Sequence, residues 1–253
     1  MGRDARACLG RLLVLAFLLE LMLVPAVLYW PIFEENVAFA KNLVPFLKGK
    51  DVLGMVEVTG FSGYVIAQHF MKGCLFGGVL GAVLFSMNAM AGEARRGTLE
   101  IWLARPLSRR RILLERWIQG ALALVVPIFL TSLTIPWLAT FVEETVAYRP
   151  LLLSSVHVSG FLLATYSLTF CLSCLGRQPT WIGGGVLALV LVQSAMYIIE
   201  ILTHWSVLRT VDIPRYVAIF ESGRLDGSVL GPTYAVALGL LVASLAIFER
   251  RTP

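Results

Sequence analysis

The sequence predicts an all-α membrane protein, a bundle of six transmembrane helices, from three observations. Hydrophobic residues make up 58% of the 253 residues and charged residues only 15%, whereas soluble domains carry about 25% charged residues. The apolar residues gather in six blocks, and each reaches the roughly 20 residues that a helix needs to cross about 30 Å of hydrocarbon. The basic residues lie mainly in alternate connecting segments. An even number of spans then places both chain ends on one side of the membrane.

The predicted spans form a single transmembrane domain over residues 1–253, with no internal repeat and no low-complexity segment. Gly73, Gly77 and Gly81 recur at four-residue spacing in the second span, and such small residues let helices pack closely. The outer segment 203–228 is of mixed polarity and predicts a short interfacial helix. The spans cover about residues 12–30, 67–91, 117–141, 151–175, 181–202 and 229–248.

The charge pattern predicts the orientation. The net charge of +5 and the pI of about 9.2 do not indicate nucleic acid, because the positive-inside rule accounts for them in a membrane protein. We expect both termini in the cytoplasm and membrane lipid around the spans. The basic residues assigned to the inner side are Arg3, Arg6, Arg11, Arg95, Arg96, Arg105, Arg109, Arg110, Arg111, Arg116, Arg177, Arg250 and Arg251.

The inner segment 92–116, between spans two and three, has its own internal pattern. Leu99, Trp102 and Leu103 fall on one face of a short helix. Pro106 should end that helix, because the residue before a proline is disfavoured in the helical region. Ser108 is well placed to cap the third span. The pattern predicts a short amphipathic coupling helix that lies across the inner surface and is rigidly continuous with both spans. For the arginines at 109–111, an anchoring role against lipid phosphates is the alternative.

The same segment resembles a known family. Glu93, the run Gly97-Thr98-Leu99-Glu100, and the run Leu103-Ala104 with Pro106-Leu107-Ser108-Arg109 resemble the signature of ABC transporter permeases of the type 2 exporter class. The six-span layout is similar to the smaller prokaryotic members, including the permease of the transporter that matures nitrous oxide reductase. This likeness implies the inner membrane of a prokaryotic cell. The resemblance implies a loop that docks on an ATP-hydrolysing subunit, through Glu93, Arg96, Gly97, Thr98, Leu99, Glu100, Trp102, Pro106, Ser108 and Arg109.

The resemblance also implies partners. It implies a second permease chain, either an identical copy or a close paralogue, and separate ATP-binding subunits that carry ATP and Mg. The sequence agrees with that division, because it has no Gly-x-x-x-x-Gly-Lys-Ser/Thr phosphate loop. We therefore expect a transport subunit that is not itself an enzyme and binds no cofactor. Export is implied by the resemblance alone, and the substrate is not predicted.

Two other classes of function stay open from the residues themselves. A membrane-embedded enzyme would need convergent catalytic groups, and neither H-E-x-x-H nor G-x-S-x-G occurs. A non-transporting scaffold is the other alternative. Glu20 lies in the first span, where a charge costs about 2.5–3.5 kcal/mol. It should face the bundle interior, a partner or water, either as part of a translocation path or in a structural hydrogen bond.

Overall fold

The computed structural model describes residues 2–43, 56, 58–97 and 108–250, and these residues form helices and turns without a strand. Six helical segments are long and apolar enough to cross a membrane, which confirms the predicted all-α six-span class. They cover Ala5–Leu28, Phe61–Met87, Arg109–Val142, Tyr148–Leu175, Pro179–Ile198 and Gly227–Arg250.

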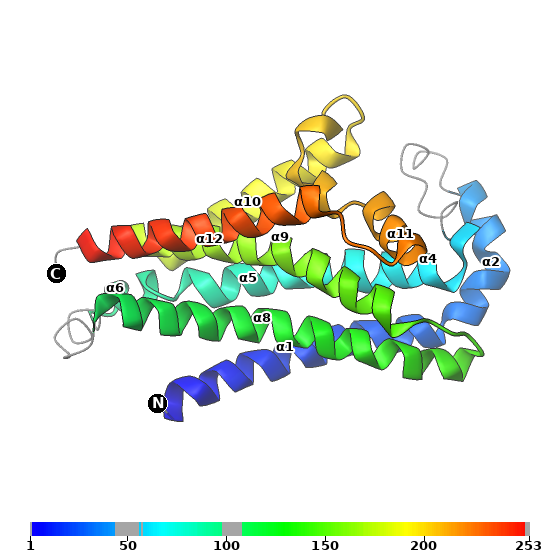
Figure 1. Cartoon of the computed structure of the whole chain (residues 1–253), viewed down its shortest axis with the longest axis horizontal. Helices are drawn as coiled ribbons and strands as arrows, with labels where there is room; N and C mark the ends of the chain where they lie inside the picture. The colour runs from blue at the N-terminus through cyan, green and yellow to red at the C-terminus, as the bar shows by residue number, and fades with distance from the viewer. Residues whose placement is uncertain (1, 44–55, 57, 98–107, 251–253) are drawn as a thin grey trace.

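The helices run roughly side by side along one long axis (Figure 1). Both chain ends and α6 (Ala91–Arg95) lie at one end of the bundle, and α2 (Trp30–Leu43), α4 (Phe61–Val65) and α11 (Ile213–Ser222) lie at the other. The two termini therefore share a side, as the even number of spans requires. That this side is the cytoplasm stays a prediction.

Five predicted span boundaries differ from the helices by four residues or more. The first helix begins at Ala5 rather than near residue 12, the second span begins at Phe61 rather than near residue 67, and the fifth ends at Ile198 rather than near residue 202. The second span consists of α4, a π-helix from Ile66 to Gly77, and α5 (Gly78–Met87), so it ends at Met87 rather than near residue 91. The third span is α8 (Arg109–Ala139), continued by the short helix Thr140–Val142. It begins at Arg109 rather than near residue 117, because the basic first turns are helical although they are not apolar.

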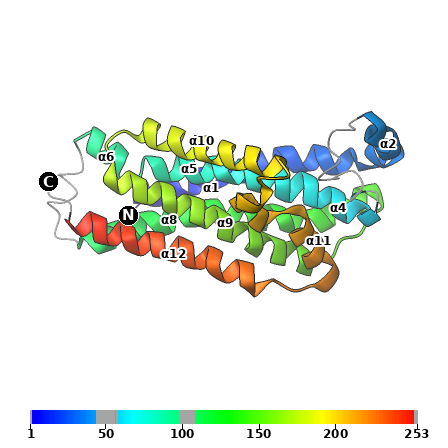
Figure 2. The same cartoon turned by 90° about the horizontal axis from the view of Figure 1, so that it is seen from above.

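The most deeply buried span is α9 (Tyr148–Leu175), which packs against α5, α8 and α12 (Gly227–Arg250). Figure 2 shows it in the middle of the bundle. Its Tyr166 is 1% exposed and lies directly against Gly120 of α8, where a Cβ atom would meet the tyrosine hydroxyl at 2.1 Å. Only a residue without a side chain fits this close approach.

The glycine spacing in the second span is a packing feature, as predicted. Gly73 and Gly77 face Leu19 of α1 (Gly2–Leu28), with a Cβ at either position 3.7 or 3.6 Å from its methyl. A Cβ at Gly81 would lie 3.4 Å from both Leu15 and Leu124. The small residues therefore bring the second span close to α1 and α8.

The outer segment differs from its prediction. Helix α11 begins after Asp212, whose side chain accepts a hydrogen bond from the Ile213 amide at 2.7 Å. Tyr216 of this helix is fully buried and stacks on Phe70, with 5.4 Å between ring centroids. The predicted short helix is thus present, and the face that carries Tyr216 packs into the bundle.

Candidate functional site

The candidate site lies at the end of the bundle that carries the termini, where the second span breaks. Helix α5 ends at Met87, the chain turns through residues 88–90, and α6 starts at Ala91. The predicted rigid continuity with the second span was therefore wrong. A helix end leaves backbone amides and carbonyls without helical partners, and this break has to satisfy them in another way.

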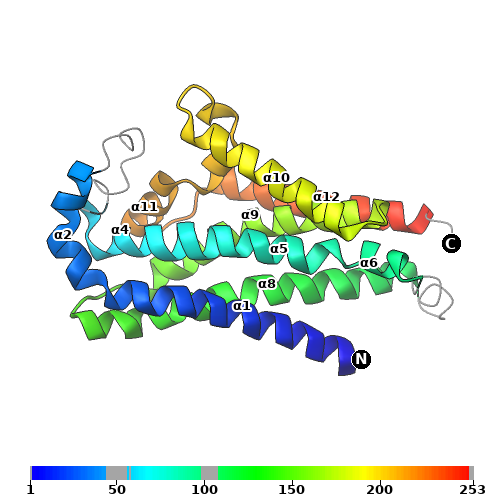
Figure 3. The same ribbon diagram turned by 180° about the vertical axis from the view of Figure 1, so that it is seen from behind.

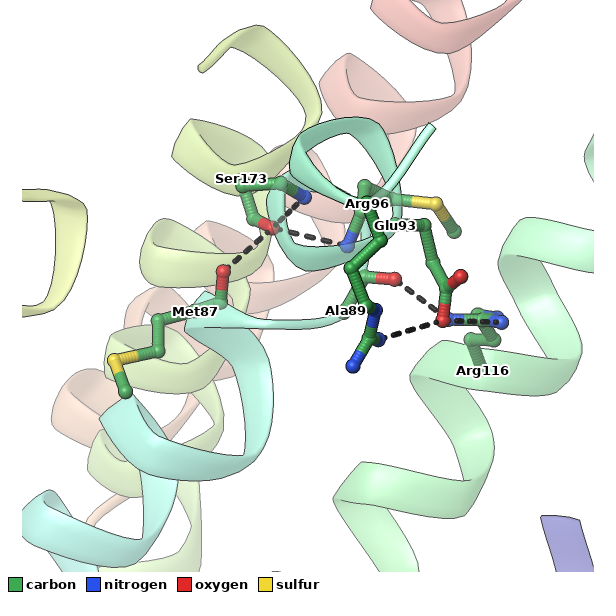
Figure 4. Close-up of polar contacts among 8 residues, drawn as sticks. Met87, Ala89, Glu93, Arg96, Arg116 and Ser173 are labelled. Carbon is green, nitrogen blue, oxygen red and sulfur yellow. Dashed lines mark hydrogen bonds and ion pairs between the residues drawn. The ribbon is translucent and has the colours of Figure 1, made fainter. Parts of the chain in front are cut away.

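One serine of α9 provides hydrogen-bond partners for the backbone groups at this break. The Ser173 hydroxyl donates to the carbonyl of Met87 at 3.0 Å, and it accepts from the amides of Met90 at 3.1 Å and Ala91 at 2.9 Å. Figure 4 shows Ser173 between the end of α5 and the start of α6. A hydroxyl has one donor and two acceptor sites, so all three are used. The fully buried Ser173 thereby fixes α6 to α9.

An ion-pair cluster fixes α6 to α8. Both terminal nitrogens of Arg116 lie 3.4 Å from the Glu93 carboxylate, and one of them donates to the carbonyl of Ala89 at 2.7 Å. Arg96 reaches the same carboxylate oxygen at 3.1 Å (Figure 4). The Glu93 side chain is 14% exposed and that of Arg116 is 22% exposed. Partial burial makes such a pair stronger than a fully solvated one.

Gly97 ends the described part of this segment. Its φ of +70° lies in the left-handed region, which glycine adopts readily and other residues adopt at a cost. The next residues, 98–107, include five of the predicted contact positions. Thr98, Leu99, Glu100, Trp102 and Pro106 therefore lie outside the described residues, and their part in the site stays a prediction.

The chain re-enters the bundle at Ser108. This residue is extended, and its hydroxyl accepts from the amide of Arg111 at 3.3 Å, which confirms the predicted cap of the third span. Arg110 forms a two-pronged ion pair with Glu249 of α12, and Arg109 donates to the backbone carbonyl of Glu249 at 3.3 Å. The start of α8 is thus tied to the end of α12.

The inner end therefore forms a connected unit, which we name the inner clamp: Glu93, Arg116, Ser173, Arg110 and Glu249. It joins α6 to α8 and α9, and α8 to α12. Sequence reasoning placed Glu93 in the loop but missed the partners. Ser173 carries no signal of its own, because a serine in an apolar span usually serves packing, and the contacts of Arg116 and Glu249 cross long stretches of sequence.

Glu20 lies apart from the inner clamp, on α1. Its carboxylate accepts a hydrogen bond from the Thr134 hydroxyl of α8 at 2.8 Å, and its side chain is partly buried. The contact is the structural hydrogen bond that the sequence left open as an alternative. A role for Glu20 in a translocation path stays a prediction. Within the described ranges, no three residues of the types His, Cys, Asp and Glu gather as a metal site would require.

The geometry of the bundle leaves the class of function open, and comparison with protein families decides it. Residues 9–216 match the ABC-2 family transporter protein. The chain belongs to the ABC-2 family. An ABC-2 protein of this kind is the membrane-spanning permease component of an ABC transporter, and membership implies an ATP-binding subunit as its partner.

The family match covers the first five spans and the whole loop from Glu93 to Arg109, whereas Glu249 of α12 lies beyond it. No curated protein and no solved structure matches this ABC-2 chain. The narrower similarity to the permease that serves nitrous oxide reductase maturation therefore stays a prediction.

Proposed function

We propose that this ABC-2 permease is the membrane subunit of an ATP-driven exporter, and that residues 93–109 receive the movement of a separate ATPase chain. The observation that carries the proposal is the attachment of α6 to α8 through Glu93 and Arg116. A partner that displaces α6 would pull on α8 directly and on α9 through Ser173. The loop then acts as a lever.

To transmit movement, the loop needs a stiff connection to the spans. The contacts of α6 with α8 form such a connection. An exposed ion pair contributes about 0–1 kcal/mol and yields easily. The Glu93–Arg116 contact is partly buried, and Arg116 is also held by the carbonyl of Ala89 at 2.7 Å. Arg110 and Glu249 extend the connection to α12. Movement of the loop would therefore reach three spans.

The remaining parts of the proposal follow from family membership. We infer a dimer of permease chains, identical or closely related, above two ATP-binding subunits that hold ATP and Mg. The inner end faces the cytoplasm, as the basic residues of that end indicate. The resemblance to small prokaryotic permeases implies the inner membrane of a prokaryotic cell. The neighbouring reading frames in the genome test the partnership cheaply. An adjacent ATP-binding subunit supports it, and further neighbours would indicate the cargo.

The test of coupling uses the chain co-expressed with its ATP-binding subunit in proteoliposomes. Coupling is the difference between the ATP hydrolysis rate of the complex and that of the isolated ATP-binding subunit. Glu93→Gln should keep the complex and remove most of that difference, whereas Glu115→Gln, at an exposed position of α8, should leave it unchanged.

A second pair of variants tests docking separately. Gly97→Pro, or Leu99→Ala combined with Trp102→Ala, should prevent the complex from forming. If either variant leaves both complex formation and coupled hydrolysis intact, the loop is not the docking element and the proposal fails.

A further inference from the structure

A long apolar groove lies on the outer face of the bundle between α10 (Pro179–Ile198) and α12. Figures 1 and 3 show α10 leaning away from the other helices toward the end opposite the termini. The groove has a volume of about 530 Å³. Helix α9 forms its floor, and α10 and α12 form its walls. We name it the α10–α12 groove and define it by Phe161, Leu168, Val186, Leu189, Val236 and Leu240.

The side-chain oxygens of the polar residues that line the groove are already hydrogen-bonded within the chain. Thr165 and Thr233 donate their hydroxyls to the backbone carbonyls four residues earlier, at 3.1 and 2.7 Å. Thr210 donates to the carbonyl of Val207 at 2.7 Å. The side-chain oxygen of Gln193 accepts from the Val207 amide at 2.9 Å. The threonine methyls are thus the groups left for an occupant, which must be apolar.

The length of the groove fits one lipid chain. A shallower hollow shares Leu168, Val186 and Leu189 with it and continues to Trp181. Between Trp181 and Gln193, α10 rises by about 18 Å at 1.5 Å per residue. One leaflet of a bilayer is about 15 Å of hydrocarbon, half of the full core. The groove and this hollow together therefore run about the depth of one leaflet along α10.

The volume of the groove suits a small molecule. Its value of about 530 Å³ lies in the range of about 300–1,000 Å³ that small ligands occupy.

An exposed arginine lies next to residues that line the outer end of the groove. Val207, Leu208 and Thr210 of the short helix Val207–Val211 line the groove, whereas Arg209 between them is exposed and is not part of the lining. Arg209 contacts the ring nitrogen of His204 at 3.1 Å, and no carboxylate among the described residues forms an ion pair with it. Trp205 beside it is 76% exposed. Exposed tryptophan is typical of the headgroup level of a membrane, so Arg209 lies at the depth of lipid phosphates.

A neighbouring arginine is already neutralised. Arg215 of α11 pairs with Asp226 at 2.5 Å. Hydrogen bonds from Ser228, together with the charge of Arg215, hold the pKa of Asp226 below its ordinary value, so this carboxylate is ionised at neutral pH. Arg209, in contrast, has its charge available beside the groove.

We propose that the α10–α12 groove binds an anionic glycerophospholipid, with one acyl chain between α10 and α12 and the phosphate at Arg209. The apolar lining, the combined length of the two hollows and the arginine beside the lining residues together match such a molecule. The site does not depend on the proposed transport function, and it lies away from the inner clamp.

The test measures lipid retention directly. The full chain is placed in nanodiscs of phosphatidylcholine with a minor fraction of phosphatidylglycerol, then transferred to detergent, and the lipids that stay bound are counted by native mass spectrometry. The wild-type chain should retain one phosphatidylglycerol with about a fivefold preference over phosphatidylcholine, as expected for one arginine near a membrane surface.

Two matched pairs of variants separate the phosphate from the acyl chain. Arg209→Gln should abolish the preference, whereas Arg224→Gln, at an exposed arginine that has no lining residue beside it in the sequence, should keep it. Val236→Trp should reduce retention of both lipids by filling the groove. Val242→Trp, at an exposed position of the same helix that does not line the groove, should not.

Three outcomes would overturn the proposal. The first is equal retention of the two lipids by the wild-type chain, and the second is an Arg224→Gln effect as large as that of Arg209→Gln. The third is a crosslink between a photocrosslinking amino acid at position 236 and a second copy of the chain. The Arg209→Gln comparison decides the question even if the bulky groove variant does not fold.

Discussion

The link between Glu93 and Arg116 allows a quantitative prediction for the inner clamp. Two guanidinium nitrogens lie 3.4 Å from one carboxylate oxygen, which gives about 5 kcal/mol of gross attraction at an effective dielectric constant of about 20. Desolvation removes part of this. Exposed pairs retain about 0–1 kcal/mol, and breaking a buried pair costs about 3–5 kcal/mol. For side chains that are 14% and 22% exposed, we expect a coupling free energy of about 2 kcal/mol.

A double-mutant cycle isolates that quantity. The variants are Glu93→Gln, Arg116→Gln and their combination, and the measurement is the free energy of unfolding in mixed micelles. The cycle cancels the loss of the Arg116 hydrogen bond to Ala89, because both arginine variants lose it. The matched control is the pair Arg111–Glu115, at 2.8 Å with side chains 60% and 47% exposed, which should couple by about 0.3–0.5 kcal/mol. Equal coupling energies for the two pairs would refute the role assigned to burial.

Three further predictions concern single positions. Ser173→Ala removes the partner of two amides and one carbonyl and should lower the free energy of unfolding by about 3 kcal/mol. The control, Ser194→Ala, loses a bond only within its own helix and should lower that free energy by less than about 0.5 kcal/mol. Equal losses in the two variants would contradict the role of Ser173 at the break between α5 and α6. Gly120→Ala should lower the free energy of unfolding by about 1–3 kcal/mol because its methyl would overlap Tyr166. Gly184→Ala, where a Cβ meets nothing within 4 Å, is the control in the same unfolding assay. Ser108→Ala should cost about 1 kcal/mol and speed hydrogen exchange in the first turn of α8, and unchanged exchange there would contradict the cap.

The sequence predicted the six spans because crossing a membrane depends on a property that sequence displays directly, the length of an apolar block. The predicted span ends were less accurate where backbone hydrogen bonds decide at which residue a helix begins or ends. The second span ends at Met87 because Ser173 provides partners for the broken ends, and hydropathy does not record such partners. The third span begins at Arg109 because a helix tolerates arginine, although the hydropathy of that turn is low.

The candidate site was predicted in part for the same reason. The family signature identified Glu93, and local spacing identified the capping role of Ser108, because a cap acts within a few residues of its own position. Arg116 is 23 residues from Glu93, and Ser173 is 83 residues from Met90. Pairings over such distances depend on how the helices pack, which one sequence does not display. The contacts of Glu249 with the start of α8 belong to the same class.

The central claim is that the loop after the second span contacts the ATP-binding subunit. A photocrosslinking amino acid at position 96 tests it most directly, because Arg96 is exposed and lies beside the inner clamp. The control position is Trp205, which is 76% exposed at the opposite end of the bundle. We predict that the co-expressed ATP-binding subunit is crosslinked from position 96 and not from position 205. A crosslink from position 205, or none from position 96 in an intact complex, would contradict the account.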